Sequence, residues 1–340
     1  MSKILISGGC GFVGTNLALE LSRNFKVYCL DNLVKQESKN NEQLLISNGI
    51  NIINEDIVNK VELSKIIKEL SPDYFIHLGA QVAMASSIED PVNDLDTNLI
   101  GTFNILESLR LFSPSTKLIN ISTNKVYGDL AWDKLVEKDS RYESIEYPKG
   151  YSEDTPLSFS GPYGCSKGAA EQYVLDYFKT YNLSTLSLRL STIYGPNQYA
   201  TYNQGWIGWF LDHIHKQQNK KSIEVSMHGN GKQVRDILYI TDFVNLISTI
   251  ISDFNKLNGE VFNIGGSYKN SMSILELLDF LKNYFNLKTD YDITNKDWRL
   301  ADQRFYVSNI DKITKHSGWK PLISLEDGLE NFSKWIFENN

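Results

Sequence analysis

The sequence predicts an α/β fold in which one parallel sheet is covered by helices on both faces. Six short runs rich in apolar and β-branched residues, each about as long as a buried parallel strand, occur before position 192. Segments with apolar residues at three- and four-residue spacing separate these runs. Parallel strands need long crossover connections, so this strand-helix alternation favours a parallel sheet.

The elements follow one another in a regular order up to about position 195. Strands are expected at residues 3–9, 25–31, 51–56, 74–80, 117–123 and 185–191, and helices at residues 14–24, 61–70, 94–111 and 163–181. Later helices open with capping-box sequences, from Ser273 to Glu276 and from Ser324 to Asp327. We therefore expect a larger domain of residues 1–194 with parts of 235–265. A smaller lobe of residues 195–340 is expected to close against the carboxyl ends of the strands.

The composition indicates which class of ligand the protein binds and in which cellular compartment it is expected. The formal net charge is -7 and no basic stripe is present, which argues against a nucleic-acid groove and favours a small-molecule ligand. No apolar run nears the length of about 20 residues needed to span a bilayer, and Met1 stands too close to the first strand for a signal peptide. Cys10, Cys29 and Cys165 show no metal-type spacing. A cytoplasmic protein without a membrane anchor or a metal site is expected.

A glycine-rich stretch follows the first strand and opens the first helix. It reads ISGGCGFVG and places Gly8, Gly11 and Gly14 at three-residue spacing. Glycine allows a tight turn and close backbone approach to a pyrophosphate, while the helix start offers unpaired N–H groups. A glycine triplet alone is weak evidence, but its place between a strand and a helix is typical of the Rossmann-type dinucleotide-binding fold.

Acidic residues at the ends of the next two strands suggest which dinucleotide binds. Asp31 and Asn32 end the second strand, where a carboxylate would accept a hydrogen bond from a ribose 2′-hydroxyl and repel a 2′-phosphate. This favours NAD over NADP, although Asp31 could instead be a simple turn residue. Asp56 ends the third strand and is a weaker candidate for holding the adenine edge.

A tyrosine and a lysine supply a candidate base. Tyr163 and Lys167 are four residues apart and lie on one face of the helix expected after Pro162. A free phenol has a pKa near 10, so about one molecule in a thousand is ionised at neutral pH. A neighbouring ammonium and the positive helix end favour phenolate, and a fall of about three pKa units would make Tyr163 a usable base. Such pairs occur by chance in many helices, but here Thr123 ends a buried strand in ISTNKVYG and supplies a hydroxyl to share the proton.

These motifs together resemble the extended short-chain dehydrogenase/reductase family of nucleotide-sugar epimerases and dehydratases over essentially the whole chain. The glycine stretch, the Asp-Asn pair, HLGAQ at 77–81, Asn98, Thr123 and the Tyr163/Lys167 pair match the family pattern in order. The resemblance implies NAD as the cofactor. It implies that the cofactor contacts are Gly8, Gly11, Phe12, Val13, Gly14, Asp31, Asn32, Asp56, Ile57, Leu78, Ala80, Gln81, Asn98, Tyr163 and Lys167.

The same resemblance assigns roles to the catalytic residues and the substrate contacts. It implies that Tyr163 removes a hydroxyl proton, that Lys167 steadies the nicotinamide ribose, and that Thr123 hydrogen-bonds the reacting oxygen. GNGKQVRDILYITD and DWRLADQR resemble the family segments whose arginines contact a diphosphate, although surface ion pairs would be the default reading of these arginines. The implied substrate contacts are Ser87, Thr123, Asn124, Gln204, Trp206, Arg235 and Arg299.

Asn124 and Lys125 discriminate between the two reactions of the family. Sugar 4,6-dehydratases carry Asp-Glu directly after the threonine, because loss of water needs an acid for the leaving hydroxyl and a base for the adjacent proton. Asn does not titrate, and Lys is cationic unless strongly buried. The sequence therefore disfavours dehydration and favours oxidation followed by re-reduction, which is epimerisation.

Several segments resemble the family members that epimerise carbon 2 of a CDP-linked deoxyhexose. NQGWIGWF at 203–210 is unusual for a sugar epimerase. Trp206 could cover a deoxysugar or belong to the core, whereas Trp209 is expected in the core. Two departures are mild: Ser7 replaces the usual Thr before the glycines, and Gly79 stands where many relatives have Ala.

Two alternatives stay open. Epimerisation at carbon 4 of a UDP-hexose would use the same Thr123, Tyr163 and Lys167, and nucleotide preference would separate the two reactions. A cofactor-binding regulator without catalysis is a different class, since fold does not imply function, but it should show decayed catalytic positions. The family resemblance also implies a homo-oligomer, a dimer or tetramer, paired through the helices at 94–111 and 163–181.

Overall fold

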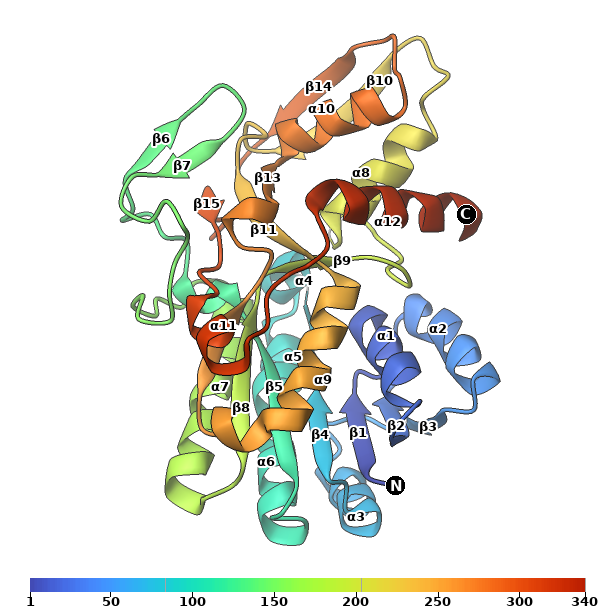
Figure 1. Ribbon diagram of the computed structural model, residues 1–340, viewed down its shortest axis with the longest axis vertical. Coiled ribbons are helices and arrows are strands. Elements are labelled where there is room, and N and C mark those ends of the chain that lie inside the picture. The colour runs from blue at the N-terminus through green and yellow to red at the C-terminus, as the bar shows by residue number, and fades with distance from the viewer. Residues whose placement is uncertain (83, 203, 340) are drawn as a thin grey trace.

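A seven-stranded parallel sheet forms the centre of the larger part of the molecule (Figure 1). The structure is a computed structural model that describes residues 1–82, 84–202 and 204–339. The strands lie in the order β12-β8-β5-β4-β1-β2-β3, and every pairing between neighbours is parallel. Their bounds are β1 (Lys3–Ser7), β2 (Lys26–Asp31), β3 (Asn51–Asn54), β4 (Tyr74–His77), β5 (Lys117–Thr123), β8 (Thr185–Leu190) and β12 (Val261–Ile264).

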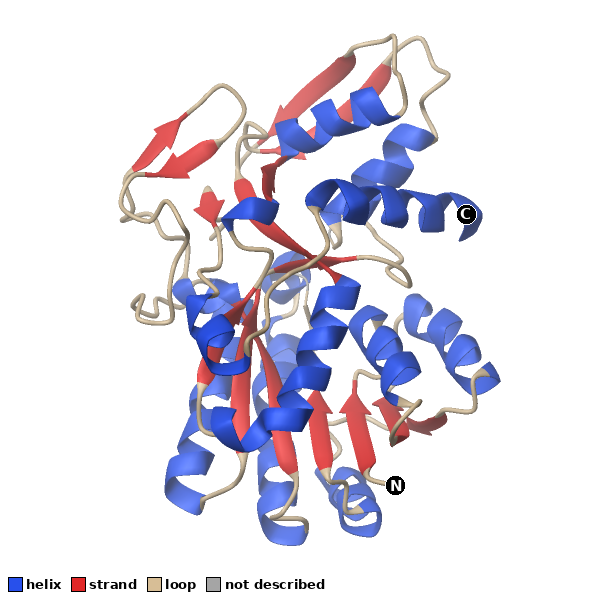
Figure 2. Cartoon of the chain, viewed as in Figure 1, coloured by secondary structure: helices blue, strands red, loops and turns tan. Residues whose placement is uncertain are grey.

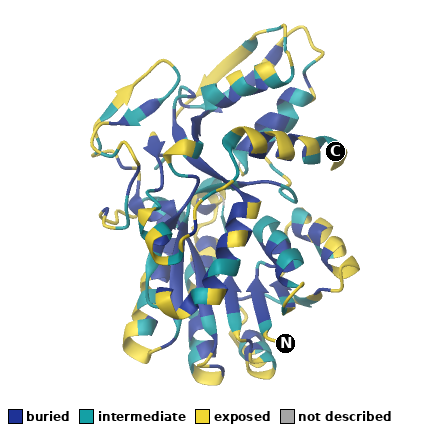
Figure 3. Cartoon of the chain, in the orientation of Figure 1, coloured by how far each residue is buried: buried dark blue, intermediate teal, exposed yellow. Residues whose placement is uncertain are grey.

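Helices cover both faces of this sheet (Figure 2). Successive side chains of a strand point to opposite faces, so Ile4 and Ile6 of β1 join one core cluster and Leu5 joins another. The first cluster includes residues of α1 (Phe12–Leu21), α2 (Gln36–Ser47), α9 (Ile240–Leu257) and α11 (Asp311–Ser317). The second includes residues of α3 (Lys60–Leu70), α6 (Gly101–Phe112) and α7 (Gly161–Tyr181). Figure 3 shows the buried strands of the sheet between helices whose outer sides are exposed to solvent.

The expected α/β class is confirmed, and each of the six expected strands is present. The single helix expected at 94–111 is interrupted. Here α4 (Met84–Glu89) and α5 (Pro91–Leu95) are followed by a π-helical turn, η1 (Asp96–Ile100), before α6 begins. The side chain of Asp90 accepts a hydrogen bond from the backbone N–H of Asn93 and starts α5, so the chain re-initiates a helix at Pro91.

The smaller lobe is built from short strands and three long helices. Strands β9 (Thr192–Tyr194), β11 (Val234–Tyr239), β13 (Ser271–Ser273) and β15 (Phe305–Tyr306) form one sheet, and β10 (Ile223–His228) pairs with β14 (Tyr291–Lys296). Its helical elements are α8 (Trp206–His215), η3 (Tyr268–Asn270), α10 (Ile274–Tyr284) and α12 (Leu325–Asn339). Both expected N-terminal caps are present: Ser273 and Glu276 form a capping box, and Ser324 accepts from the backbone of Asp327.

The segment between β5 and α7 leaves the sheet and contacts the smaller lobe. It contains a 3-10 turn, η2 (Asn124–Tyr127), and a hairpin of β6 (Leu135–Glu137) and β7 (Tyr142–Ser144). Arg141 forms an ion pair with Glu276 of α10 at 2.8 Å and so fixes the hairpin to the lobe. Within the described residues, no helix has both the length and the apolar character that crossing a bilayer requires.

Candidate active site

A cavity of about 740 Å³ lies between the carboxyl ends of the central strands and the smaller lobe. Open α/β sheets bind their ligands at this edge. The cavity is lined by the turn after β1, the ends of β2, β4 and β5, the start of α7, and segments of β10, β11 and α8. Of the residues that the sequence predicts as site residues, all line this cavity except Ser87 and Asn98.

The glycine turn leaves backbone free for a ligand at the start of α1. Gly8 has a φ of +67°, and a Cβ on Gly14 would lie 2.4 Å from the carbonyl oxygen of Gly8. Gly11 is the N-cap residue and has no side chain to satisfy the first N–H groups of the helix. Phe12 and Val13 follow it along the cavity wall. Helix-start amides without a capping side chain fit the pyrophosphate of a dinucleotide.

Asp31 lies at the end of β2 with its carboxylate already oriented. Its Oδ2 accepts from the backbone N–H of Cys10 at 3.0 Å, and its Oδ1 accepts from Leu33 at 3.0 Å. Burial raises the pKa of Asp31 above its usual value, and these two backbone hydrogen bonds oppose that rise. Each carboxylate oxygen has a second lone-pair site, so the group can still accept from a ribose hydroxyl.

A small polar cluster lines the cavity where β2 and β3 end. Asn32 donates from Nδ2 to Oδ2 of Asp56 at 2.8 Å, and Ile57 lines the wall beside them. Lys35 also lines the cavity and acts electrostatically on Asp31, but no sequence motif marks it as a site residue.

Asn98 and Ser87 are buried outside the cavity. Asn98 has no exposed surface; its Oδ1 accepts from the backbone N–H of Gln81 at 2.9 Å, and its Nδ2 donates to Oγ of Ser166 at 3.1 Å. It therefore connects the loop after β4, where Leu78, Ala80 and Gln81 line the cavity, to α7. Ser87 donates its hydroxyl to the carbonyl of Met84, one turn earlier in its own helix.

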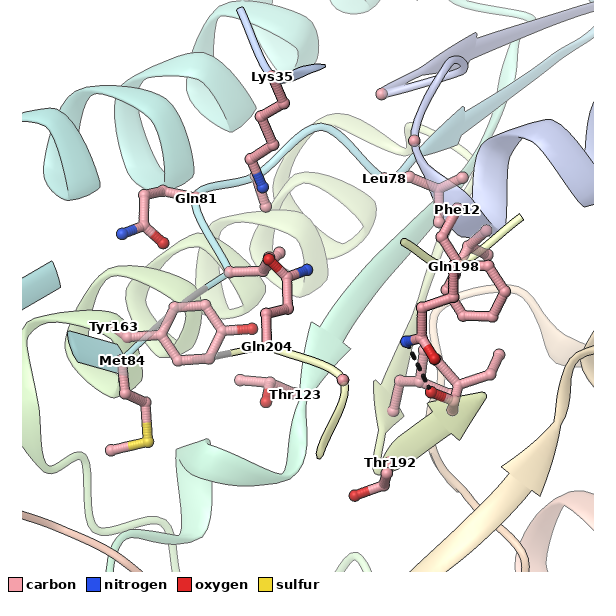
Figure 4. A pocket seen from close by; sticks show the side chains of 18 of the residues that line it. Phe12, Lys35, Leu78, Gln81, Met84, Thr123, Tyr163, Thr192, Gln198 and Gln204 are labelled. Atoms are coloured by element: carbon pink, nitrogen blue, oxygen red, sulfur yellow. Dashed lines mark hydrogen bonds between the residues drawn. The ribbon is translucent and has the colours of Figure 1, made fainter. Parts of the chain in front are cut away.

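Thr123, Tyr163 and Lys167 come together at the centre of the cavity. Thr123 is the last residue of β5, and Tyr163 is in the first turn of α7, which begins after Ser160. The hydroxyl of Tyr163 points into the cavity beside the side chain of Thr123 (Figure 4). One turn further along α7, Lys167 donates from Nζ to the carbonyl oxygen of Ile121 at 2.6 Å. A phenol, a hydroxyl and an ammonium therefore share one wall of the cavity.

The expected fall in the pKa of Tyr163 is wrong for the protein alone. Burial raises the pKa of Tyr163 to about 12, and the hydrogen bond from Thr123 opposes only part of that rise. Burial also lowers the pKa of Lys167 to about 8, although Glu171 and Asp94 favour its charged form. Loss of hydration dominates because the phenol is enclosed, and the ammonium of Lys167 is directed at a backbone carbonyl.

Asn124 is held in place by a second amide. Its Nδ2 donates to Oε1 of Gln303 at 3.0 Å, and Gln303 in turn donates to the carbonyl of Gly128 at 2.7 Å. With its orientation fixed, Oδ1 of Asn124 accepts from the hydroxyl of Thr123 at 3.3 Å. The position directly after Thr123 therefore offers a neutral acceptor and no acid.

On the side of the cavity nearest the smaller lobe, the carboxylate of Asp302 lies among three cationic side chains. Oδ1 of Asp302 lies 2.6 Å from Nη2 of Arg235 and 3.4 Å from Nζ of Lys125. Arg299 acts electrostatically on this carboxylate and donates to the carbonyl of Tyr202 at 3.4 Å. Although burial opposes it, Arg235 and Lys125 hold the pKa of Asp302 below its usual value. Arg235 and Arg299 were expected here; Lys125 and Asp302 were not, although each stands within a motif singled out in the sequence.

An aromatic wall closes the cavity on the side of α8. Trp206 and Trp209 are both half-buried, and both pack against the main core cluster and line the cavity. The expectation that Trp209 belongs to the core is therefore met in part, because the same side chain also faces the cavity. Trp209 stacks on His213 at 4.5 Å between ring centroids and packs edge-on against Tyr202. Gln204 also lines the cavity, near Tyr163 and Thr123 in Figure 4, whereas Asn203 of the same motif lies outside the described residues.

Comparison with known proteins finds similarity over nearly the whole chain. The profile of the family described as GDP-mannose 4,6 dehydratase matches residues 5–332. A CDP-paratose 2-epimerase from Salmonella typhi is 43% identical over 335 residues, which cover 98% of this chain and 98% of that protein. A dTDP-glucose 4,6-dehydratase from Salmonella typhimurium is 29% identical over 352 residues, covering 99% of this chain and 93% of that one.

A solved structure agrees over the same extent. A UDP-glucuronic acid 4-epimerase from Bacillus cereus, in complex with UDP-glucuronic acid and NAD, matches with a TM-score of 0.83 and 26% identity. The match covers 99% of this chain and 100% of that one.

Proposed function

The chain belongs to the family of NAD-dependent nucleotide-sugar epimerases and dehydratases described as GDP-mannose 4,6 dehydratase, and from this premise we propose that it converts CDP-paratose to CDP-tyvelose by epimerisation at carbon 2. It is an enzyme that uses NAD and epimerises a nucleotide sugar. Similarity over the full length to a CDP-paratose 2-epimerase supports the choice of nucleotide and carbon.

One observation carries the choice of epimerisation over dehydration. The cavity holds a hydroxyl and a phenol in Thr123 and Tyr163, but the two positions after Thr123 carry Asn124 and Lys125. Asn124 is held by Gln303 as a neutral amide, which does not titrate and so cannot act as an acid or a base. Dehydration would need a titrating acid and base there, whereas oxidation and re-reduction of one carbon need only the base at Tyr163.

The mechanism begins with removal of the proton from the 2-hydroxyl of the sugar. Tyr163 accepts this proton while Thr123 hydrogen-bonds the same oxygen. When bound, NAD+ supplies the hydride acceptor for carbon 2, then after reduction the hydride donor, and its positive charge favours the phenolate form of Tyr163. Lys167 lies one helical turn from Tyr163, and in the proposed mechanism its ammonium would hydrogen-bond the nicotinamide ribose. Burial raises the pKa of Tyr163 to about 12 in the protein alone, so the proposed base depends on the positive charge of bound NAD+ to lower it.

Inversion requires the oxidised sugar to present its other face. In the proposed mechanism the 2-keto sugar turns over within the cavity while Arg235 and Arg299 hold the diphosphate. With the hydride supplied to the opposite face of carbon 2, Tyr163 would give the proton back to the oxygen. Substrate and product have the same oxidation state, so no external reductant is consumed.

The experiment that tests the proposal is proton NMR of the purified protein with CDP-paratose and no added reductant. Changes in the H1 and H2 couplings that match the 2-epimer would establish the reaction, the carbon and the nucleotide together. An unchanged spectrum from protein that contains NAD would rule out this substrate.

A second candidate is epimerisation at carbon 4 of a UDP-hexose. The structural similarity to a UDP-glucuronic acid 4-epimerase favours it, and Thr123, Tyr163 and Lys167 would serve this reaction equally. Incubation with UDP-glucose under the same NMR conditions separates the two, because only a 4-epimerase would produce UDP-galactose.

A further inference from the structure

We propose that Lys125 binds the phosphate that is joined to the sugar and so sets carbon 2, rather than carbon 4, against Tyr163. This inference rests on the proposed function and adds to it a residue that determines which carbon reacts. Lys125 is neither a catalytic base nor a cofactor contact in this reading. Among the cationic residues that line the cavity, Lys125 is the one nearest to Thr123 in sequence.

The position of Lys125 links two parts of the cavity. It lies in η2, two residues after Thr123, and its side chain is only 14% exposed. Its Nζ reaches across to Asp302, the carboxylate that also binds Arg235 at 2.6 Å. Lys125 therefore connects the cationic side of the cavity, where Arg235 lies, with the end of β5, where Thr123 lies.

The charges of this cluster fit a diphosphate. Lys125, Arg235 and Arg299 carry three positive charges, and Asp302 carries one negative charge. Two positive charges remain, which balance the two negative charges of a diphosphate that links a nucleoside to a sugar. Burial of unbalanced cations is costly, so an anion that enters the cluster is strongly favoured.

The local electrostatics make Lys125 responsive to such an anion. Burial lowers the pKa of Lys125 to about 8, and although Asp302 opposes this, Arg235 and Arg299 lower it further. Asp302 shares one oxygen between Lys125 and Arg235, at 3.4 Å and 2.6 Å, so the bond to Lys125 is the longer one. A lysine ammonium has three N–H donors and the contact with Asp302 uses one of them, so Lys125 retains donors for a phosphate oxygen.

The carbon that reacts decides whether a phosphate can reach Lys125. Carbon 2 is bonded to carbon 1, which carries the diphosphate, so the sugar-linked phosphate lies only a few bonds from the reacting oxygen. Carbon 4 lies across the ring from carbon 1, and the diphosphate then points away from the catalytic hydroxyl. A cation two residues from Thr123 therefore suits a substrate whose edge between carbons 1 and 2 faces Tyr163.

The test compares a nucleoside diphosphate with the corresponding monophosphate. Lys125→Met removes the charge and keeps an unbranched side chain, and titration calorimetry measures binding of CDP and CMP to the NAD-loaded protein. CDP affinity should fall at least tenfold, because the second phosphate loses its cation, whereas CMP affinity should change less than about twofold. Lys125→Arg should retain most of the CDP affinity.

Equal losses for CDP and CMP, or no loss for either, would overturn the proposal. Retained NAD content reports that the variant is folded, and Lys125→Gln repeats the comparison if Lys125→Met does not fold. If the protein prefers uridine nucleotides, the proposed substrate is wrong, but UDP and UMP then test Lys125 in the same way. In the active enzyme, Lys125→Met should raise KM and also lower kcat, since the same contact orients carbon 2. A rise in KM with unchanged kcat would contradict the role in choosing the carbon.

Discussion

The affinity for CDP should depend on pH through Lys125, and the size of the effect follows from its surroundings. The pKa of this ammonium is lowered to about 8 by burial, with Asp302 raising it and Arg235 and Arg299 lowering it. About nine-tenths of the molecules are then protonated at pH 7 and about one-tenth at pH 9. If only the ammonium binds the second phosphate, CDP affinity should fall about tenfold between these pH values. The terminal phosphate has its own pKa near 6, so it stays ionised over this range.

Calorimetry in two buffers of different ionisation enthalpy would measure both the affinity and the proton taken up. At pH 8 about half a proton should be bound per CDP, because about half of the lysines are neutral before binding. Lys125→Arg is the matched control, since a guanidinium keeps its charge throughout the range and the pH dependence should disappear. The pKa of Lys167 is also about 8, but this residue bonds the carbonyl of Ile121. A tenfold fall that persists in Lys125→Arg would therefore assign the titration to another group and refute the reasoning.

Three further outcomes are expected. Tyr163→Phe should lower kcat by at least about a hundredfold while the protein keeps its NAD, and normal turnover in steady-state assays would exclude this residue as the base. Gly14→Ala should abolish NAD retention, because the added Cβ would lie 2.4 Å from the carbonyl oxygen of Gly8. Gly79→Ala is the matched control and should keep NAD, because the atoms nearest to its added Cβ are 3.4 Å away. The absorbance of the cofactor released from each purified variant measures the difference. Arg189→Met should lower the free energy of unfolding by about 3–5 kcal/mol, since it leaves the fully buried carboxylate of Glu171 unpaired. Adding Glu171→Leu should restore most of that loss in denaturant titrations, and a double variant as unstable as the single one would argue against an unpaired charge as the cause.

The order of strands and helices in the larger domain was predictable because its signals are local. Alternating apolar runs specify buried strands, and the spacing of Gly8, Gly11 and Gly14 specifies a turn that leads into a helix. Tyr163 and Lys167 face the same way because one helical turn separates them, which needs no knowledge of the rest of the fold. The short strands of the smaller lobe carry no comparable periodicity, and their pairing was not predictable.

The sequence by itself determined the α/β class, the glycine motif and the spacing of Tyr163 and Lys167, since each depends on residues close together in the chain. Only the tertiary structure decided in which direction the pKa values of Tyr163 and Lys167 shift. Lys125 and Asp302 are 177 positions apart and meet only because the smaller lobe folds over the end of β5. Asn98 matches the family motif, but its side chain is buried outside the cavity and hydrogen-bonds Gln81 in the loop after β4 and Ser166 in α7. Tyr163 is enclosed and keeps its proton, because desolvation depends on the packed surroundings of a group and not on its neighbours in sequence.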